Sequence, residues 1–416
     1  MEIGGDQEGV EDVVIVGGGI AGLATTLALR RVGVQALVLE RSDQLRASGG
    51  AILLFSNAWV ALEALGVAHK LSSIYPPLQS GYVTNESGEV VSHRTSQESN
   101  MKRPVRIVKR KDVLEAIADE LPTNTIRFSS KLSSIETRTN EASSLALLHM
   151  EDGSIIKTKV LIGCDGVHSV VASWLGLSKP VYSSRSALRG LGVMPQGHGL
   201  NNESHIFLQD GYRVGVGPLN DREAHWFIIY NCTSLEEDEE NMIVMDPKIL
   251  MKKVLQMVAN FPPLFLQLVQ HTDPATLTWA PLMFRIPWDL MFRNLSIGIV
   301  TVAGDALHPM TPELGQGGCT SLEDAVVLGR HIGTCFLKDK IIQPLEVAKV
   351  LKLYAKERRF RSISLILASY VFGWFQLEGS FQRLKSYVRD TIFFKYVYQR
   401  TIAHVTKYDC GKLPVV

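Results

Sequence analysis

One stretch near the N-terminus restricts the possible folds more than any other. The segment VEDVVIVGGGIAGLATTLALRR has a short apolar run, then Gly17-x-Gly19-x-x-Gly22, then apolar residues at helical spacing. The apolar run is typical of a parallel strand buried on both faces. Gly17 allows a tight turn, Gly19 leaves room for a pyrophosphate, and Gly22 lets helix and strand pack closely. With the return strand VQALVLE, residues 10–42 are predicted to form a Rossmann-like strand, glycine turn, helix and strand.

An acidic residue ends the return strand. Glu40 closes the run VQALVLE, and a carboxylate at this place can accept hydrogen bonds from ribose hydroxyls. Its charge also repels a 2′-phosphate, so this first site suits FAD or NAD rather than NADP. Ile20, Ala21 and Arg41 flank these positions and are included as candidate cofactor contacts.

Two more stretches combine a strand pattern with glycines. GDALHPMTPELGQGG, from Gly304 to Gly318, leads into a segment of helical pattern. A glycine cluster that opens a helix favours an anion bound on backbone N–H groups. A nucleotide fold needs only one such loop, so the second loop requires a ligand of its own. KTKVLIGCDGVHSVV, which contains Asp165 and Gly166, repeats the pattern of a buried strand followed by a glycine turn.

The order of these patterns predicts a discontinuous nucleotide-binding domain. Its segments are residues 1–75, 101–185 and 288–335. Residues 76–100 and 186–287 carry alternating or continuous apolar runs between turn residues, which favours an inserted antiparallel sheet that binds substrate. Residues 336–416 are mainly helical in pattern. We therefore expect an α/β fold with an inserted sheet domain and a helical C-terminal region.

The chain length, net charge and cysteine count exclude several classes of protein. At 416 residues the chain can form two or three domains, and its net charge of +1 gives no overall field that attracts nucleic acid. Five scattered cysteines without a CxxC spacing favour a reducing compartment and predict neither a disulfide framework nor a metal site.

The chain also lacks the patterns of export and of membrane insertion. The first residues, MEIGGDQEGVED, have neither an apolar signal core nor an arginine-rich transit pattern, so we expect a cytoplasmic protein. No run reaches the roughly 18 apolar residues of a membrane-spanning helix. Ser362–Phe375 is apolar almost all round. It predicts a helix packed against the body of the protein, and peripheral membrane association is the alternative.

The three glycine motifs, in this order, resemble those of the FAD-dependent aromatic hydroxylases and epoxidases. These are single-component flavoprotein monooxygenases with the p-hydroxybenzoate hydroxylase fold. Within them the chain is most similar to the plant group around zeaxanthin epoxidase and the salicylate-hydroxylase-like monooxygenases, which suggests plant secondary metabolism. The resemblance extends to YDCGKL near the end of the chain.

The resemblance implies an activity. NADPH or NADH would reduce FAD, and O2 would add to give a C4a-hydroperoxyflavin. This species would insert one oxygen atom into a small aromatic or isoprenoid-type substrate, by hydroxylation or epoxidation. The flavin carries this chemistry, so no amino-acid nucleophile is expected. NAD(P)H would bind transiently, since the chain has no second complete GxGxxG unit. The expected protein is a monomer or a homodimer.

The resemblance also assigns roles to residues. Asp305 would bind the ribityl chain of FAD, and Arg110 the pyrophosphate. Asp165 and Gly166 would contact FAD and, through the backbone, NAD(P)H. The remaining cofactor contacts near the flavin would be Gly304, Pro312, Gly315, Gln316, Gly317 and Gly318. A helix N-terminus at this place would stabilise the anion of reduced flavin. The first loop would thus hold the pyrophosphate and the second the reactive end.

The chain departs from the family pattern at two places. Ala172 and Ser173 stand where the family has an arginine, which leaves the nicotinamide contacts open. Glu313 stands where many relatives have asparagine. A carboxylate beside the flavin would disfavour its anionic form unless it is protonated, turned away or paired with a basic residue. His308 could act as a general base, but a structural role is favoured.

Other basic and aromatic residues are weaker candidates. Arg46 matches an arginine in a segment that moves in the family, with a surface role as the alternative. A basic stretch could meet NADPH phosphates, although a solvated strand is favoured; it contains Lys102, Arg103, Arg106 and Lys109. The substrate is expected between the flavin and the inserted sheet, near Arg189, His205, Tyr212, Trp226, Phe227 and Tyr230, with a place in the core or on the surface as the equal alternative for each of them. Two alternatives to oxygen insertion stay open: a flavin oxidase or reductase, and a non-catalytic flavin-binding protein.

Overall fold

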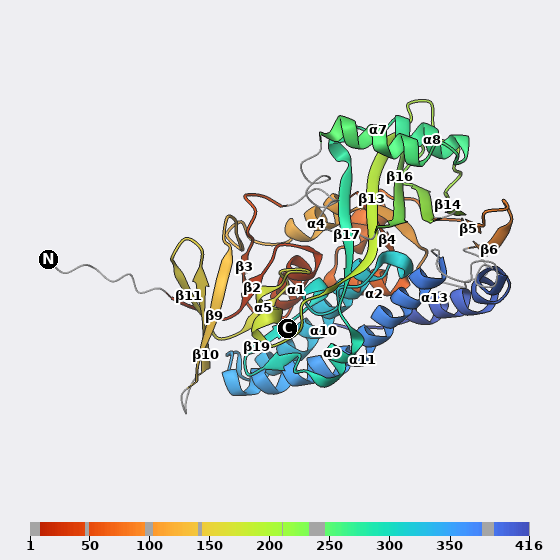
Figure 1. The fold of residues 1–416 in the computed structure, drawn as a ribbon. Helices are drawn as coiled ribbons and strands as arrows, with labels where there is room; N and C mark the ends of the chain where they lie inside the picture. Colours follow the sequence, from red (N-terminus) through yellow and green to blue (C-terminus); the bar gives the residue numbers. More distant parts are fainter. Residues whose placement is uncertain are drawn as a thin grey trace.

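The structure is a computed structural model of the chain (Figure 1). It describes residues 9–45, 50–95, 103–139, 144–209, 211–232, 246–376 and 387–415. The helices and sheets form one α/β assembly, with a seven-stranded sheet standing above a smaller, mostly parallel sheet and its helices.

A six-stranded sheet lies at the centre of the nucleotide-binding part. Its strand order is β18-β19-β12-β2-β3-β8. All neighbouring pairs are parallel except β18 and β19. The strands are β2 (Val14–Val16), β3 (Leu37–Leu39), β8 (Ile126–Arg127), β12 (Leu161–Gly163), β18 (Ser296–Ile297) and β19 (Val300–Val302). The residues of β2 are almost fully buried, as expected for a parallel strand covered on both faces.

Two smaller sheets flank this centre. One has the order β1-β11-β10-β9 and the other pairs β4 with β7. Their bounds are β1 (Val10–Glu11), β9 (Leu132–Thr139), β10 (Ser144–Met150), β11 (Ile155–Thr158), β4 (Ala51–Leu54) and β7 (Arg106–Lys109).

The large sheet has the order β17-β13-β16-β15-β14-β5-β6. Its neighbours are antiparallel except β14 and β5. The strands are β5 (Ser80–Thr84), β6 (Val90–Thr95), β13 (Val181–Val193), β14 (Glu203–Gln209), β15 (Tyr212–Pro218), β16 (Glu223–Asn231) and β17 (Thr278–Phe284). Two distant segments of the chain therefore build one sheet, and β13 begins five residues before the expected boundary at 186.

Helices cover these sheets and make up most of the C-terminal region. The α-helices are α1 (Ile20–Arg31), α2 (Ser56–Leu65), α3 (Ala68–Ser72), α4 (Arg110–Ala118), α5 (Val170–Trp174), α7 (Pro247–Met257), α8 (Pro263–Gln270), α9 (Pro287–Phe292), α10 (Gly317–Asp339), α11 (Pro344–Gln376) and α13 (Gln399–Val405). Short 3-10 turns are η1 (Pro274–Thr276), η2 (Gly304–Ala306) and η3 (Pro312–Leu314), and η4 (Arg389–Tyr398) is a π-helix.

Helices α1 and α10 pack side by side in the same direction. A Cβ atom added at Gly329 would lie 2.7 Å from the Cβ of Ala28, and one added at Gly333 would lie 2.8 Å from the Cβ of Val32. The two glycines therefore let the helix backbones approach closely. Near the N-terminal ends of both helices, Gly318 lies beside Ile20. Both helix N-termini consequently reach the same edge of the central sheet.

The apolar segment Ser362–Phe375 lies within α11. One side of it is packed: Leu365, Ile366 and Phe372 are buried. On the other side Leu367 is 51% exposed. The predicted packing of this segment is thus found on one side only. In the described part of the chain, none of the helices combines the length and the apolar character needed to cross a membrane.

Candidate active site

The three glycine motifs meet at one edge of the central sheet. Gly17 follows β2, Asp165 lies two residues after the end of β12, and Gly304 lies two residues after the end of β19. These strands are neighbours in the sheet and run parallel, so their carboxyl ends lie side by side. In open α/β sheets this edge is where ligands bind.

The first motif has three glycines with three different surroundings. Gly17 has φ +107°, and a Cβ there would lie 2.3 Å from the carbonyl oxygen of Cys164. A Cβ on Gly22 would lie 1.9 Å from the carbonyl oxygen of Gly17. At Gly19 a Cβ would have no protein atom within 4 Å. Gly17 and Gly22 are therefore required by packing, whereas Gly19 borders open space.

That space belongs to a cavity of about 490 Å³. Loops at the ends of the central strands line it, together with β17 of the large sheet. Lining residues that the sequence singled out are Gly17, Gly19, Glu40, Arg41, Arg110, Asp165 and Gly166. The cavity also has Ser130, Lys131 and His168 in its wall, which the sequence analysis did not identify.

Glu40 is nearly buried and is held by the backbone. Its Oε2 accepts a hydrogen bond from the N–H of Gly18 (2.6 Å), and its Oε1 accepts one from the N–H of Ser42 (2.9 Å). Each carboxylate oxygen can accept a further hydrogen bond. Glu40 therefore fixes the glycine turn and keeps acceptor capacity toward the cavity.

Asp165 caps a helix. Its carboxylate accepts hydrogen bonds from the hydroxyl of Ser169 and from the N–H groups of Val170 (2.7 Å) and Val171 (3.3 Å), at the start of α5. Burial raises the pKa of Asp165, and these hydrogen bonds oppose that rise. Gly166, with φ +82° and no atom within 4 Å of an added Cβ, leaves its backbone facing the cavity.

The second glycine loop also borders open space. A Cβ on Gly317, the first residue of α10, would meet no atom within 4 Å. Neither α10 nor α1 has a side-chain hydrogen bond at its N-cap, which is Gln316 in α10 and Gly19 in α1. Two helix N-termini with uncapped N–H groups therefore lie at the same edge of the sheet. Both are suited to anionic groups.

Gly304 and Gly315 shape this loop. Gly304 has φ +61°, and a Cβ there would lie 2.6 Å from the Cβ of Ala21, which joins the second loop to the first helix. Gly315 has φ +63° and packs against Phe55 and Leu53. Gln316 is buried, and its side-chain oxygen accepts a hydrogen bond from Asn57 (2.8 Å). Pro312 begins the turn η3.

Asp305 keeps an exposed surface at this edge. The surrounding protein nevertheless removes water from its carboxyl and raises its pKa, while the charges of His308, Arg110 and Arg189 oppose the rise. Burial lowers the pKa of Arg189, against the charge of Asp305. Arg110 from α4, Arg189 from β13 and Asp305 from η2 thus form one electrostatic cluster between the two glycine loops.

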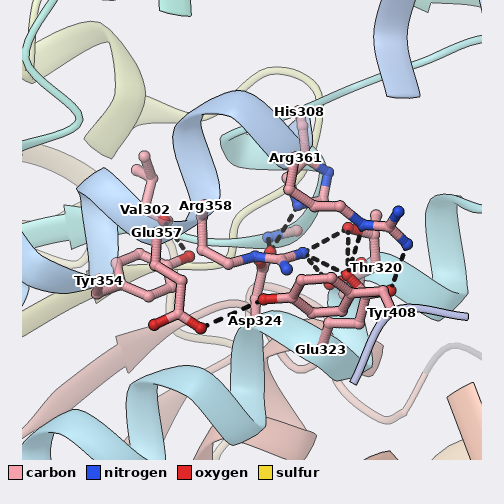
Figure 2. Close-up of polar contacts among 12 residues, drawn as sticks. Val302, His308, Thr320, Glu323, Asp324, Tyr354, Glu357, Arg358, Arg361 and Tyr408 are labelled. Atoms are coloured by element: carbon pink, nitrogen blue, oxygen red, sulfur yellow. Dashed lines mark hydrogen bonds and ion pairs between the residues drawn. The ribbon is translucent and has the colours of Figure 1, made fainter. Parts of the chain in front are cut away.

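A buried polar network lies behind the second loop (Figure 2). Asp324 of α10 accepts hydrogen bonds from the N–H of Gly304 (2.8 Å), Nε2 of His308 (2.6 Å) and Nε of Arg358 (2.6 Å). Burial raises the pKa of Asp324, but the charges of His308 and Arg358 and the hydrogen bonds outweigh it and bring the pKa to about 2. His308 is fully buried in this network, which gives it a structural position.

The network continues toward the C-terminal region. Glu323 pairs with Arg358 (2.8 Å) and with Arg361 (2.7 Å), and its Oε1 accepts a hydrogen bond from Asn57 (2.6 Å). The hydroxyl of Tyr354 bonds the carbonyl of Val302, the last residue of β19 (3.0 Å). Helix α11 is therefore anchored to the strand end and to the loop that form the site.

Glu313 is neither solvent-exposed nor alone. It is 2% exposed, and its Oε1 pairs with Nη1 of Arg185, which is 5% exposed. Its Oε2 has no hydrogen-bond partner among the described residues. Of the arrangements considered from the sequence, the structure has the one in which Glu313 pairs with a basic residue.

Arg213 of β15 lies close to this pair. Burial lowers its pKa, and the charges of Tyr398 and Glu313 oppose the shift. Its guanidinium group lies over the ring of Phe227, 5.4 Å from the centroid. Nε and Nη1 of Arg213 lack hydrogen-bond partners in the described part of the chain. A buried guanidinium with two nitrogens that lack hydrogen-bond partners is costly unless a further acceptor binds there.

The residues expected near the substrate lie on two different faces of the large sheet. Arg189 and Phe227 are cross-strand partners on the face toward the glycine loops. His225 shares this face: it lies 3.2 Å from a Cβ placed on Gly50, and burial, together with the charge of Arg189, lowers its pKa to about 4.

Four other expected substrate residues need correction, because they lie on the opposite face. Trp226 is fully buried in a core formed with α7 and α8, where its Nε1 bonds Thr272 (2.8 Å). Tyr230 and Tyr212 belong to the same side of the sheet. His205 stacks between Tyr82 and Phe207 on that face. In this structure these four residues pack the outer face of the sheet.

The basic stretch before α4 is engaged by protein groups where it is described. Arg103 pairs with Glu63 (2.6 Å), and Lys109 with Glu223 (2.8 Å). Arg106 bonds the carbonyl of Tyr75 (2.9 Å). Arg46 and Lys102 lie outside the described residues.

A second cavity, of about 130 Å³, lies beyond the second loop. Leu53 and Phe55 stand between it and Gly315. Its other walls come from β5, β6, β14 and the C-terminal helices, through residues such as Val83, Ile206, Tyr398 and Ile402. The lining is mainly apolar and lies on the inner side of the large sheet.

The site has two glycine loops that border open space, each beside an uncapped helix N-terminus. An acid follows each of three strands, and the large sheet lies above them. This is the arrangement of an FAD-dependent oxidoreductase. The comparisons with known proteins identify the family. The chain belongs to the FAD binding domain family, whose model matches residues 11–359.

The relatives specify the class of enzyme. The chain is 39% identical to Monooxygenase 2 of Arabidopsis thaliana over 98% of this chain and 99% of that protein. It is 27% identical to the aurachin C monooxygenase/isomerase of Stigmatella aurantiaca, over 89% of this chain and 91% of that protein. The Klebsiella pneumoniae HpxO structure with FAD and uric acid is similar in fold, with TM-score 0.79 and 21% identity over 98% of this chain and 99% of that one. The chain is therefore an FAD-dependent monooxygenase that uses NAD(P)H.

Proposed function

We propose that FAD lies across the carboxyl ends of β2, β12 and β19, with its pyrophosphate at Gly19 and its flavin at Gly317. The observation that carries this proposal is the open space beside these two glycines, each at an uncapped helix N-terminus. In a loop whose other glycines are tightly packed, an unfilled Cβ position favours a ligand that approaches the backbone. The residues present therefore fit FAD.

At the adenosine end, Glu40 would accept hydrogen bonds from the ribose, and Arg110 would balance the pyrophosphate charge. Glu40 keeps acceptor capacity beyond its bonds to Gly18 and Ser42, and Arg110 lines the same cavity. Ile20, Ala21 and Arg41 complete this end, with the backbone of Gly166 on the opposite wall.

At the flavin end, Asp305 would bind the ribityl chain, and the backbone from Pro312 to Gly318 would line the ring. When bound and reduced by NAD(P)H, FAD supplies the chemistry that activates O2 and transfers one oxygen atom. The chain's own contribution is electrostatic: the N-terminus of α10 stabilises negative charge on the reduced ring. Arg189, beside Asp305, adds a positive charge at the same place.

The substrate would lie between the second glycine loop and the inner face of the large sheet. A small aromatic or isoprenoid-type molecule suits the mainly apolar lining of the second cavity. Arg213, with two nitrogens that lack hydrogen-bond partners on this face, supports a substrate that carries an anionic or strongly polar oxygen. Hydroxylation and epoxidation are both compatible with this arrangement.

The proposal also covers the cellular location and the oligomeric state of the enzyme. All five cysteines are free thiols, which supports a reducing, cytoplasmic location. The Arabidopsis relatives support a role in plant secondary metabolism. We propose a monomer or homodimer that acts on a small molecule with O2 and NAD(P)H.

Two variants of the first glycine motif test the cofactor position. Gly19→Ala adds a methyl group into open space, at a backbone conformation (φ −82°) that alanine adopts easily. It should leave the fold intact and reduce FAD binding at least tenfold, since the methyl group occupies the expected pyrophosphate position. Gly22→Ala is the matched control, because its Cβ would lie 1.9 Å from the carbonyl oxygen of Gly17. This variant should lose stability whether or not FAD binds.

The readouts are FAD affinity by flavin fluorescence and unfolding of the FAD-free protein. Wild-type FAD affinity in Gly19→Ala would contradict the proposed position of the pyrophosphate.

Oxygen insertion is tested separately, by oxygen-18 labelling of the product in a screen of phenolic acids and isoprenoids. NAD(P)H oxidation without labelled product from any of them would instead support an oxidase or reductase.

A further inference from the structure

Helix α11 has an exposed apolar stripe. Leu353, Phe360, Leu367 and Trp374 follow one another at intervals of seven residues and are 52%, 67%, 51% and 56% exposed. A spacing of seven residues keeps side chains on nearly one side of a helix. The stripe therefore runs along most of α11, on the side turned away from the protein.

Helix α9 adds two aromatic side chains beside this stripe. Trp288 and Phe292 are 63% and 80% exposed. α9 lies alongside α11 at the lower edge of Figure 1. Arg359 of α11 fixes this position, because its Nη1 donates to the carbonyls of Leu290 and Met291. We call this surface the α9–α11 face.

The α9–α11 face carries more positive than negative charge. Lys349, Lys352 and Lys356 occupy exposed positions between or beside the apolar residues. The one acid near the lysines, Glu346, has a side chain that is 45% exposed and pairs with Lys349 (2.6 Å), which leaves Lys352 and Lys356 as the uncompensated charges. Glu357 is partly buried and pairs with Arg330 (2.5 Å).

We propose that the α9–α11 face docks on the anionic phospholipid surface of a membrane. Tryptophan and other aromatic side chains favour the boundary between headgroups and acyl chains. A helix with an apolar side flanked by lysines is typical of binding in the plane of such a boundary. The lysine side chains are long enough to reach the headgroups while their stems lie on the apolar surface.

The composition favours lipid over a protein partner. The cores of protein–protein interfaces are depleted in lysine, whereas lysines beside an apolar surface add attraction to anionic lipids. The face also suits shallow binding. No described helix could span a bilayer, and the buried side of α11, with Leu365 and Tyr354 fully covered, holds the helix to the enzyme.

The test is flotation of the FAD-loaded enzyme with vesicles of phosphatidylcholine, with and without phosphatidylserine. The enzyme should bind the vesicles that contain phosphatidylserine, and high salt should weaken the binding, since the lysine attraction is screened. Lys352→Glu/Lys356→Glu should weaken it by about 25-fold or more, taking about fivefold per lysine. Phe292→Ser/Phe360→Ser should reduce binding at least tenfold even at low salt.

Helix α7 offers matched controls. Lys248 and Lys252 are exposed with the same four-residue spacing as Lys352 and Lys356, and Ile249 is 57% exposed. Lys248→Glu/Lys252→Glu and Ile249→Ser should leave vesicle binding unchanged. Because these helices lie far apart in Figure 1, equal losses in both sets would refute a specific docking face.

Two other results would overturn the proposal. In the first, the FAD-loaded enzyme binds neither kind of vesicle. In the second, the enzyme is a dimer that Phe292→Ser/Phe360→Ser converts to monomers without any vesicle binding, which would make the face a contact between two copies of the chain. Flavin absorbance shows in each variant that the fold and the cofactor are retained. The outcome is independent of which substrate the enzyme oxidises.

Discussion

Asp324 joins the second glycine loop to the C-terminal helix, and its substitution gives the sharpest test of the buried network. It is fully buried and accepts hydrogen bonds from Gly304, His308 and Arg358. Asp324→Asn keeps the size of the side chain but removes the charge that faces Arg358. Removing one partner of a buried ion pair costs about 3–5 kcal/mol. Since Glu323 still pairs with Arg358, we expect a loss near the lower limit, about 3 kcal/mol.

The pH dependence gives a second, independent expectation. The pKa of Asp324 falls from its ordinary value of 3.8 to about 2 in the folded protein. The stability from this lowered pKa is fully present above about pH 4, and it is lost as the pH falls toward 2. Nearly two pKa units correspond to about 2–3 kcal/mol. In Asp324→Asn this part of the acid dependence should be missing.

Urea denaturation of the FAD-free protein, followed by tryptophan fluorescence between about pH 2 and 7, measures both effects. Asp339→Asn is the control, because Asp339 is exposed at the end of the same helix. FAD affinity should also fall in Asp324→Asn, since asparagine has one acceptor oxygen for the three groups that the two oxygens of Asp324 hold, which loosens the loop at Gly304. A loss of stability below about 1 kcal/mol, with an unchanged acid dependence, would refute the role given to this carboxylate.

Three further substitutions address the cofactor site. Glu40→Ala should weaken FAD binding by about one to two powers of ten, from a charge-assisted hydrogen bond of about 1.5–3 kcal/mol; an unchanged dissociation constant would place the ribose elsewhere. Asp305→Ala should lose FAD to a similar degree while the melting temperature of the FAD-free protein stays nearly constant, because Asp305 keeps an exposed surface. Glu313→Gln should destabilise the fold by about 3–5 kcal/mol, because Arg185 is left buried without its partner, and should raise the flavin midpoint potential by tens of millivolts, at about 30 mV per 1.4 kcal/mol. Spectroelectrochemical titration that gave equal potentials would place Glu313 too far from the flavin to act on it.

The glycine motifs could be predicted because their information is local. A buried parallel strand, a tight turn and a helix start each require particular residues within a few positions, and Gly17 and Gly22 have the backbone contacts that these roles demand. Their meeting at one edge also follows, since neighbouring parallel strands end on the same side. The same holds for the second loop, where a glycine cluster that opens a helix predicts a bound group and Gly317 borders open space.

The faces of the large sheet could not be predicted in the same way. EAHWFIIYNC is apolar along most of its length, so its pattern does not separate one face from the other. The choice is made by α7 and α8, which cover Trp226 and leave Phe227 and His225 toward the glycine loops. On β13 a signal was available: Arg185 and Arg189 are four residues apart and therefore share a face.

The charge pairs depend on contacts between distant segments. Glu313 and Arg185 are 128 residues apart, and Asp324 and Arg358 are 34 apart. A sequence shows that acids inside apolar segments need partners, but packing decides which partner each one has.

For Glu313 the partner changes the effect expected on the flavin. Seen alone, its carboxylate is a repulsive charge beside a reduced flavin, whereas in the fold it is one half of a buried pair. Its replacement therefore changes two things at once: it removes a negative charge and it frees Arg185. Comparing Arg185→Met with the double variant Arg185→Met/Glu313→Gln separates them, because Arg185 is absent from both. If the charge of Glu313 reaches the flavin, the double variant should have the higher midpoint potential.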